Sequence, residues 1–134
     1  MKMRPSLETR EALEILRAGQ AEADRVGLAA TIAVVDHAGI LLCLQRSDGA
    51  KAHTVELAIR KARSAAMLHI STAILERMAA EGRTMSPEIS ALGGGLPLMV
   101  PEGCAGAVGV SGGTSEVDHK VAEVAVASTS VFLR

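Results

Sequence analysis

The sequence is poor in aromatic side chains: it has no tryptophan, no tyrosine and a single phenylalanine. The core must therefore be filled by Leu, Ile, Val, Ala and Met, which bury less area each than aromatic residues do. The many Ala and Gly residues allow helices and strands to approach one another closely instead. Because 49% of the residues are nonetheless apolar, we expect some apolar surface to be buried between copies of the chain, in a homo-oligomer.

An excess of charge of one sign is also missing. The formal net charge is −1, and basic residues are scattered apart from Arg60, Lys61 and Arg63, so the chain lacks the electrostatic footprint of a nucleic-acid-binding protein. No apolar run is long enough to span a bilayer, and the chain does not open with a signal peptide. We therefore expect a cytoplasmic protein that binds neither nucleic acid nor membrane.

Motifs for metal binding are absent as well. Cys43 and Cys104 have no CxxC partner, and we interpret both as small buried hydrophobic residues. None of the four histidines has another at the spacing of a helical or hairpin ligand pair, and no carboxylate-rich motif accompanies them. The sequence predicts no metal site made by protein ligands alone.

Hydrophobic periodicity and turn residues predict a single domain over residues 1–134. The predicted helices span residues 6–26, 50–68, 71–80 and 116–132, and the predicted strands span residues 30–36, 40–45, 96–100 and 104–111. Turns at residues 36–39 and 101–103 join the strands into two hairpins. The pattern therefore predicts an α/β fold with an antiparallel sheet and helices on its faces.

Residues 106–119 are the most informative stretch, because an apolar strand runs through the Gly112–Gly113 turn directly into a helix. Ser115 can cap this helix, and Asp118 completes a pair that resembles a capping box. Backbone N–H groups at such a junction favour an anion. Residues 93–95, which include Gly94 and Gly95, form a second glycine cluster near a strand end. The two loops could frame one pocket, and tight-turn geometry is an equal alternative.

Several polar side chains are further candidates for the site. Asp36, Arg46 and Asp48 bracket the first hairpin, and turn formation and rim ion pairs are favoured for them, although Arg46 could clamp a carboxylate. His37 lies at the tip of the hairpin turn. His53 opens a helix after a glycine turn. Lys61 follows it in alanine-rich surroundings, where a lysine could act as a base or form a Schiff base. More often such a lysine extends its ammonium to water, which is the interpretation we favour.

The motifs resemble those of a known family. Residues 33–36, followed by a glycine turn and a strand that ends in Arg-Ser-Asp-Gly-Ala at 46–50, look like the first signature of the GlcG/HbpS family, also called DUF336. Residues 58–62 are similar to its helix with a Lys-Ala pair. Residues 93–98 and 106–114, with Asp118 downstream, resemble its last signature. The match spans nearly the whole chain in the family's order.

This resemblance implies a profilin-like α/β/α fold with a five-stranded antiparallel sheet, and homo-oligomers. Family members include haem-binding or haem-degrading proteins, a domain attached to corrinoid adenosyltransferases, and proteins encoded beside glycolate or diol catabolism genes. Our leading hypothesis is therefore a homo-oligomeric protein of a catabolic pathway that binds an organic acid or a tetrapyrrole, either haem or a corrinoid. The ligand-binding candidates are Asp36, His37, Arg46, Gly94, Gly95, Gly112 and Gly113.

Two details complete the hypothesis. If haem binds, His53 or His37 is the expected axial ligand, because imidazole is a common donor to haem iron. The alternative function is an enzyme, a tautomerase, lyase or hydrolase, that acts on a small carboxylate. In that case His53 or Lys61 would be the base, and the glycine loops would hold the anion.

Overall fold

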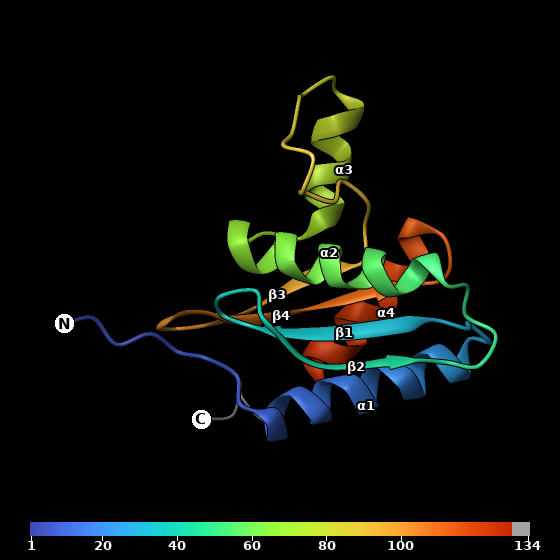
Figure 1. Ribbon diagram of the computed structural model, residues 1–134, viewed down its shortest axis with the longest axis horizontal. Helices are drawn as coiled ribbons and strands as arrows, with labels where there is room; N and C mark the ends of the chain where they lie inside the picture. The colour runs from blue at the N-terminus through green and yellow to red at the C-terminus, as the bar shows by residue number, and fades with distance from the viewer. Residues whose placement is uncertain (130–134) are drawn as a thin grey trace.

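One antiparallel sheet runs through the middle of the protein, and its strands follow the order β2-β1-β4-β3 (Figure 1). The computed structural model describes residues 1–129. The strands are β1 (Thr31–Asp36), β2 (Leu41–Arg46), β3 (Gly95–Val100) and β4 (Gly103–Ser111), and the helices are α1 (Thr9–Arg25), α2 (His53–Leu68), α3 (Thr72–Ala80) and α4 (Ser115–Ala127). Both predicted hairpins are present, as β1–β2 and β3–β4.

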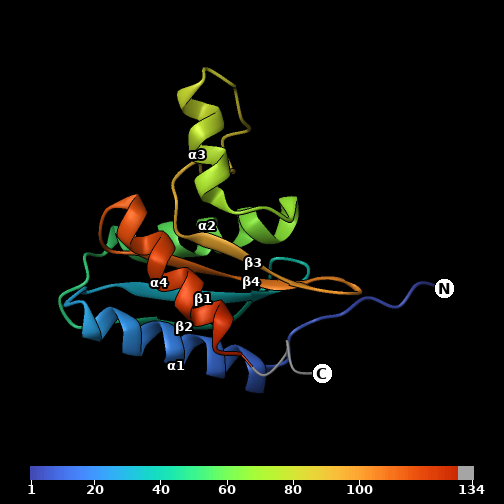
Figure 2. The same ribbon diagram turned by 180° about the vertical axis from the view of Figure 1, so that it is seen from behind.

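The helices make three layers with the sheet. Helix α2 lies on one face, α1 and α4 lie together on the other, and α3 projects away from the sheet (Figures 1 and 2). Among residues 1–129, none of the helices combines the length and the hydrophobicity needed to cross a bilayer.

The expected five-stranded sheet is wrong, because the described residues form four strands. The stretch before α1 makes one strand-like contact, in which the Leu7 N–H donates to the Ala105 carbonyl oxygen over 2.9 Å. Pro5, two residues earlier, has no N–H with which to continue a ladder. The N-terminal segment therefore stays outside the sheet.

Helix boundaries differ from the predictions by a few residues. Helix α1 begins after Glu8 rather than at Ser6, because Glu8 and Glu11 form a reciprocal capping box. Ser71 caps α3 as predicted. The cap of α4 is Thr114, whose hydroxyl accepts the Val117 N–H, and not Ser115. Helix α4 ends at Ala127, and Phe132, where its end was predicted, lies outside the described residues.

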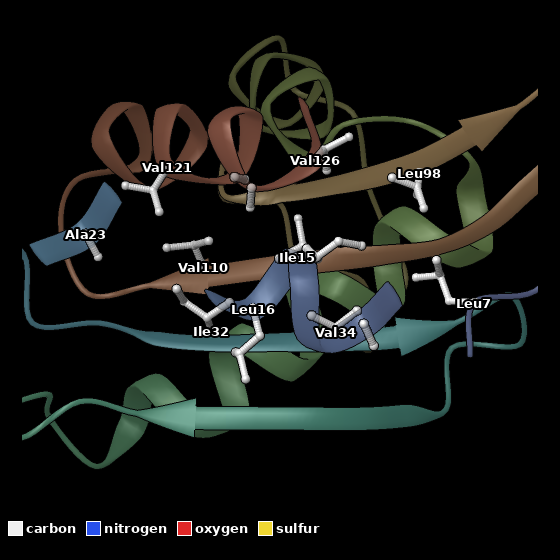
Figure 3. Close-up of a cluster of buried hydrophobic side chains, with 14 of the residues drawn as sticks. Leu7, Ile15, Leu16, Ala23, Ile32, Val34, Leu98, Val110, Val121 and Val126 are labelled. Atoms are coloured by element: carbon white, nitrogen blue, oxygen red, sulfur yellow. The ribbon is translucent and has the colours of Figure 1, made fainter. Parts of the chain in front are cut away.

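The face toward α1 and α4 is packed with branched side chains, and we call it the wide face. Figure 3 shows them interdigitating between the sheet and the two helices. Strand β1 supplies Ile32 and Val34, which alternate with residues on the opposite side of the strand. The whole cluster includes Leu7, Ile15, Leu16, Ile32, Val34, Leu98, Val108, Val110, Val121 and Val126.

The face toward α2 is lined by small residues, and we call it the close face. Its buried cluster comprises Val35, Ala62, Ala65, Ala66 and Ala107. Gly109 sits on β4 where α2 approaches, and a Cβ placed there would collide with the Ala58 carbonyl oxygen of α2. The backbones of α2 and β4 are therefore in direct contact, which only a residue without a side chain permits.

Candidate ligand-binding pocket

A pocket of about 470 Å³ opens at the end of the sheet where β1 begins and β4 ends. Its volume falls in the range of roughly 300–1,000 Å³ that is usual for small-molecule sites. The first turn of α2, the β4–α4 turn and the segment before β1 line it. The lining residues are Gly27, Leu28, Ala29, Gly49, Lys51, His53, Thr54, Leu57, Lys61, Leu92, Ser111, Gly112, Gly113, Ser115 and Asp118.

A buried ion pair between Lys61 and Asp118 lies in the wall of this pocket. Both side chains are 2% exposed, and Lys61 Nζ lies 3.1 Å from Asp118 Oδ2. The ammonium also donates to the Val110 carbonyl oxygen over 2.9 Å. The expectation that Lys61 extends its ammonium to water is therefore wrong. Its place on the close face directs it along the sheet edge instead of outward.

The ammonium occupies a position that a neighbouring strand would otherwise fill. Strand β3 begins at Gly95, which is paired with Gly109 of β4, so the next residue of β4, Val110, lies beyond the end of β3. There the Val110 N–H donates to the Gly94 carbonyl oxygen, and the Val110 carbonyl accepts from Lys61. Lys61 thus satisfies a buried backbone group that would be costly to leave unpaired.

The environment shifts the protonation equilibrium of Lys61. Burial lowers the pKa of the Lys61 amine from its usual value, while the Asp118 carboxylate and, more weakly, Glu76 act to raise it. The loss of water around the ammonium outweighs both carboxylates, so the pKa is lowered overall. Lys61 is therefore more easily deprotonated than a surface lysine.

Gly94 and Gly95 lie against Lys61 and are not among the residues that line the pocket. Gly94 has a φ of +129°, and a Cβ there would collide with the Val110 carbonyl oxygen and lie 3.0 Å from Lys61 Nζ. A Cβ at Gly95 would collide with the Lys61 carbonyl oxygen. The structure therefore places this glycine cluster over the ion pair, where close approach of the backbone requires it.

Gly112 and Gly113 do line the pocket, but an internal carboxylate already occupies one of the two amides. The Gly113 N–H donates to Asp118 Oδ1 over 2.9 Å. Because Oδ2 faces Lys61, the two oxygens of Asp118 join the β4–α4 turn to α2. The sequence predicts an anion at this turn, and the anion that the Gly113 amide binds is the side chain of Asp118.

His53 and Lys51 are the exposed polar residues at the mouth of the pocket. The first turn of α2 holds them in place through Thr54, whose hydroxyl donates to the Lys51 carbonyl oxygen over 2.6 Å. The same hydroxyl lies 2.9 Å from the Thr31 hydroxyl at the start of β1. This buried contact anchors the mouth of the pocket to the sheet.

The remaining predicted site residues lie elsewhere. Arg46 ends β2 at the same end of the sheet, but its Nε donates to the Ala50 carbonyl oxygen over 3.0 Å. Asp36 and His37 lie at the opposite end. There Asp36 Oδ1 accepts the Ala38 and Ile40 amides, and His37 Nδ1 contacts the Ser6 hydroxyl. His37 lines a separate, smaller pocket of about 190 Å³.

Metal-ligating side chains do not gather in the part of the chain that the structure describes: no three His, Cys, Asp or Glu residues there are placed to share an ion. Cys104 is buried and Cys43 partly so, and burial raises the pKa of both thiols. Both cysteines therefore remain protonated at neutral pH, as expected of side chains that serve packing.

Sequence reasoning missed the two other charged residues of the pocket as ligand-site candidates, Lys51 and Asp118. Asp118 was assigned to helix capping and to the family's last signature, but not to the ligand site, although its partner Lys61 was a candidate. The available signal was the lysine itself, since a charged residue among Ala58, Ala62 and Ala65 on the inward face of a helix requires a partner. Lys51 gave no signal apart from its proximity to His53.

Comparisons with known proteins agree with the motifs. The family model described as "Haem degrading protein HbpS-like" matches residues 7–127. Protein GlcG of Escherichia coli strain K12 is 38% identical over 114 residues, which cover 83% of this chain and 85% of GlcG. The crystal structure of Klebsiella pneumoniae protein ORFY, assigned to DUF336, has a TM-score of 0.89 at 30% identity, covering 96% of this chain and 93% of ORFY.

A second solved structure with a similar fold contains a ligand. A structure described as a complex of PduOC with haem has a TM-score of 0.85 at 25% identity, covering 92% of this chain and 94% of that one. The family model spans most of the chain, and the curated relative exceeds 30% identity over more than two thirds of it. The chain therefore belongs to the HbpS-like family, the GlcG/HbpS family that its motifs indicate.

Proposed function

We propose that this chain is a homo-oligomeric protein that binds a small carboxylate-bearing molecule, an organic acid or a tetrapyrrole, in the pocket at the α2–β4 end of the sheet. The observation that carries the proposal is the chemistry of the lining. Lys61 and Asp118 neutralise each other, so Lys51 is the remaining charged side chain among the described residues that line the pocket. A pocket with one cation, one imidazole and a glycine turn favours an anion.

The tetrapyrrole version of the proposal rests on His53. Its imidazole is at the mouth of the pocket, whereas His37, the other candidate, lies at the opposite end of the sheet. Imidazole is a usual axial donor to haem iron, and Lys51 is placed to pair with a propionate. The likeness to the PduOC complex with haem supports this assignment. Bound haem would supply an iron centre for redox or oxygen chemistry.

The test separates the two ligand sources. Hemin is titrated against the protein and its Soret band followed, and pyruvate binding is measured by calorimetry. A Soret shift that His53→Ala abolishes and His37→Ala leaves intact supports haem. Heat of pyruvate binding without a Soret shift supports an organic acid. The absence of both, with hemin and with a panel of mono- and dicarboxylic acids, contradicts the proposal.

Assembly is the second part of the proposal. Exposed apolar side chains, among them Ile40, Met67 and Met99 at 61%, 53% and 41% exposure, support burial of apolar surface between copies of the chain. Light scattering at micromolar concentration is expected to give at least the mass of a dimer. The mass of a single chain would contradict this part.

The enzyme hypothesis is the second candidate function, and the buried Lys61 favours it. An amine with a lowered pKa beside a carboxylate is suited to proton abstraction from a small carboxylate substrate. Exchange of the methyl protons of pyruvate in D2O, followed by NMR, tests it. Exchange that Lys61→Arg removes and His53→Ala retains assigns the base to Lys61, and the converse pattern assigns it to His53. No exchange above the buffer rate contradicts both assignments.

A further inference from the structure

The main pocket is lined by the primary amine of a buried lysine, Lys61. Lys61 is fixed by two acceptors, the Val110 carbonyl and the Asp118 carboxylate, at 2.9 and 3.1 Å from Nζ. It lines the pocket although only 2% of its side chain is exposed, so the pocket reaches it at the deep end. An ammonium carries three donors, and these two acceptors account for two of them.

We propose that Lys61 forms a Schiff base with a small carbonyl compound that carries a carboxylate, a 2-oxo acid, with Asp118 as the proton carrier. This inference rests on the proposed function, because it assigns the ligand class and the reacting atom of the same pocket. Lys51 at the mouth provides the charge that a carboxylate needs. The carbonyl carbon is then directed toward the deep end, where Lys61 lies.

The chemistry balances with the groups present. Lys61 Nζ passes one proton to Asp118 Oδ2 across their 3.1 Å contact. The freed electron pair attacks the carbonyl carbon, and a proton moves from nitrogen to oxygen, which gives a neutral carbinolamine. Asp118 then returns its proton to the hydroxyl, which leaves as water while the C=N bond forms. The product is a protonated imine beside an ionised Asp118, so charge is conserved and no external oxidant or reductant is consumed.

Two charged groups act on Lys61, Asp118 on α4 and Glu76 on α3, and both favour the ammonium. Burial opposes them and is the larger effect, so the pKa of Lys61 is lowered overall. A larger fraction of neutral amine is then present at neutral pH than at a surface lysine. Lys120 provides the comparison, because its side chain is 67% exposed.

The experiment uses the full-length wild-type protein with pyruvate and sodium cyanoborohydride at neutral pH, followed by digestion and mass spectrometry. Reduction of the imine adds the mass of one pyruvic acid less one oxygen atom. We expect Lys61 to be the principal site of the adduct, in excess over Lys120, because its lowered pKa leaves a larger fraction of the amine neutral. Acetone, which lacks the carboxylate, is expected to label Lys61 more slowly than pyruvate at the same concentration.

Two variants sharpen the result. Lys61→Arg keeps a cation beside Asp118 but has no nucleophilic amine, so the adduct is lost, whereas Lys51→Met keeps the Lys61 adduct and needs more pyruvate. Adducts spread over surface lysines, with Lys61 unlabelled in the wild type, overturn the inference even if a variant fails to fold. Calorimetric pyruvate or hemin binding without a Lys61 adduct overturns this inference alone. No binding of hemin or of any acid in the carboxylic-acid panel, together with no adduct, overturns the proposed function as well.

Discussion

On the wide face of the sheet, branched side chains such as Ile32 and Val110 fill the space below α1 and α4, whereas on the close face Gly109 and Ala62 leave almost no space below α2. The wide face gains stability by burying large apolar area, about 25 cal/mol per Å². The close face buries less area per residue but fixes the distance between α2 and β4. Close contact of the backbones, rather than the amount of buried surface, sets the position of the functional candidate Lys61.

The close contact has a direct effect on chemistry. Because the α2 backbone touches β4, the side chain of Lys61 reaches past the start of β3 to the Val110 carbonyl and to Asp118 on α4. The helix on one face is thereby bonded to the helix on the other. A bulkier close face would lift α2 away from the sheet and withdraw the amine from both partners.

The largest expected effect comes from Gly109→Ala, which adds one methyl group to the close face. The new Cβ would collide with the Ala58 carbonyl oxygen, so α2 must move as a unit. We expect a loss of more than about 4 kcal/mol in the free energy of unfolding, or no cooperative folding. Chemical denaturation followed by far-UV circular dichroism measures it, since the chain has no tryptophan.

Val108→Ile is the matched control, because it adds one methyl group to the neighbouring residue of β4, which belongs to the wide-face cluster. Overpacking there is expected to cost about 1–3 kcal/mol. Equal losses for the two variants would contradict the difference between the faces.

The next largest effect is expected for Lys61→Met, which leaves the Asp118 carboxylate buried without its cation. Breaking a buried pair from one side costs about 3–5 kcal/mol. Adding Asp118→Asn to Lys61→Met is expected to recover part of the loss, because the amide removes the charge and still accepts the Gly113 N–H. The exposed pair of Lys120 and Glu116, 3.4 Å apart, serves as the control, and Lys120→Met should change stability by less than about 1 kcal/mol. A Lys61→Met variant as stable as Lys120→Met would show that the buried pair is not coupled to the fold.

A moderate loss in the free energy of unfolding is expected when a large side chain of the wide face is truncated. Ile32 is fully buried, and Ile32→Ala is predicted to cost about 2–5 kcal/mol in thermal or chemical denaturation. Ile32→Leu keeps the volume and should cost less than about 1.5 kcal/mol, because branched side chains can repack. If Ile32→Leu were as damaging as Gly109→Ala, the wide face would be as rigid as the close face.

The smallest effect on stability is expected for Lys51→Met at the mouth of the pocket. This exposed residue supports neither face, so the free energy of unfolding should stay within about 0.5 kcal/mol. Affinity for pyruvate or hemin, measured by titration, is expected to fall roughly two- to five-fold, as the loss of one exposed charge pair implies. Unchanged affinity for both would place the ligand elsewhere.

Much of the fold could be predicted, because its signals are local. The run from residue 30 to 36 and its glycine turn predict the first hairpin, and Ser71 marks the start of α3. The strand count could not be derived this way, because it came from the family resemblance, and the pairing of the N-terminal segment with β4 has no local signal either. That pairing involves Leu7 and Ala105, which are far apart in the sequence.

The site was only partly predictable for the same reason. His53, Lys61, Gly112 and Gly113 were chosen from local patterns, and all line the pocket. The pairing of Lys61 with Asp118 spans 57 residues, and no periodicity connects them. Because the sequence does not reveal this contact, we expected the Lys61 ammonium to be exposed to water, as is usual for a lysine in the middle of a helix. Its buried position was therefore missed.

The small residues of the close face also limit how the sequence can change. Ala and Gly have the smallest side chains, so almost every substitution at Gly109 or Ala62 adds volume, and little of it can be offset by trimming neighbours that, apart from Val35, are themselves small. A wide-face residue such as Ile32 can shrink or change shape while others repack around it. We therefore expect the wide face to tolerate many substitutions during evolution and the close face, which positions Lys61, to tolerate very few.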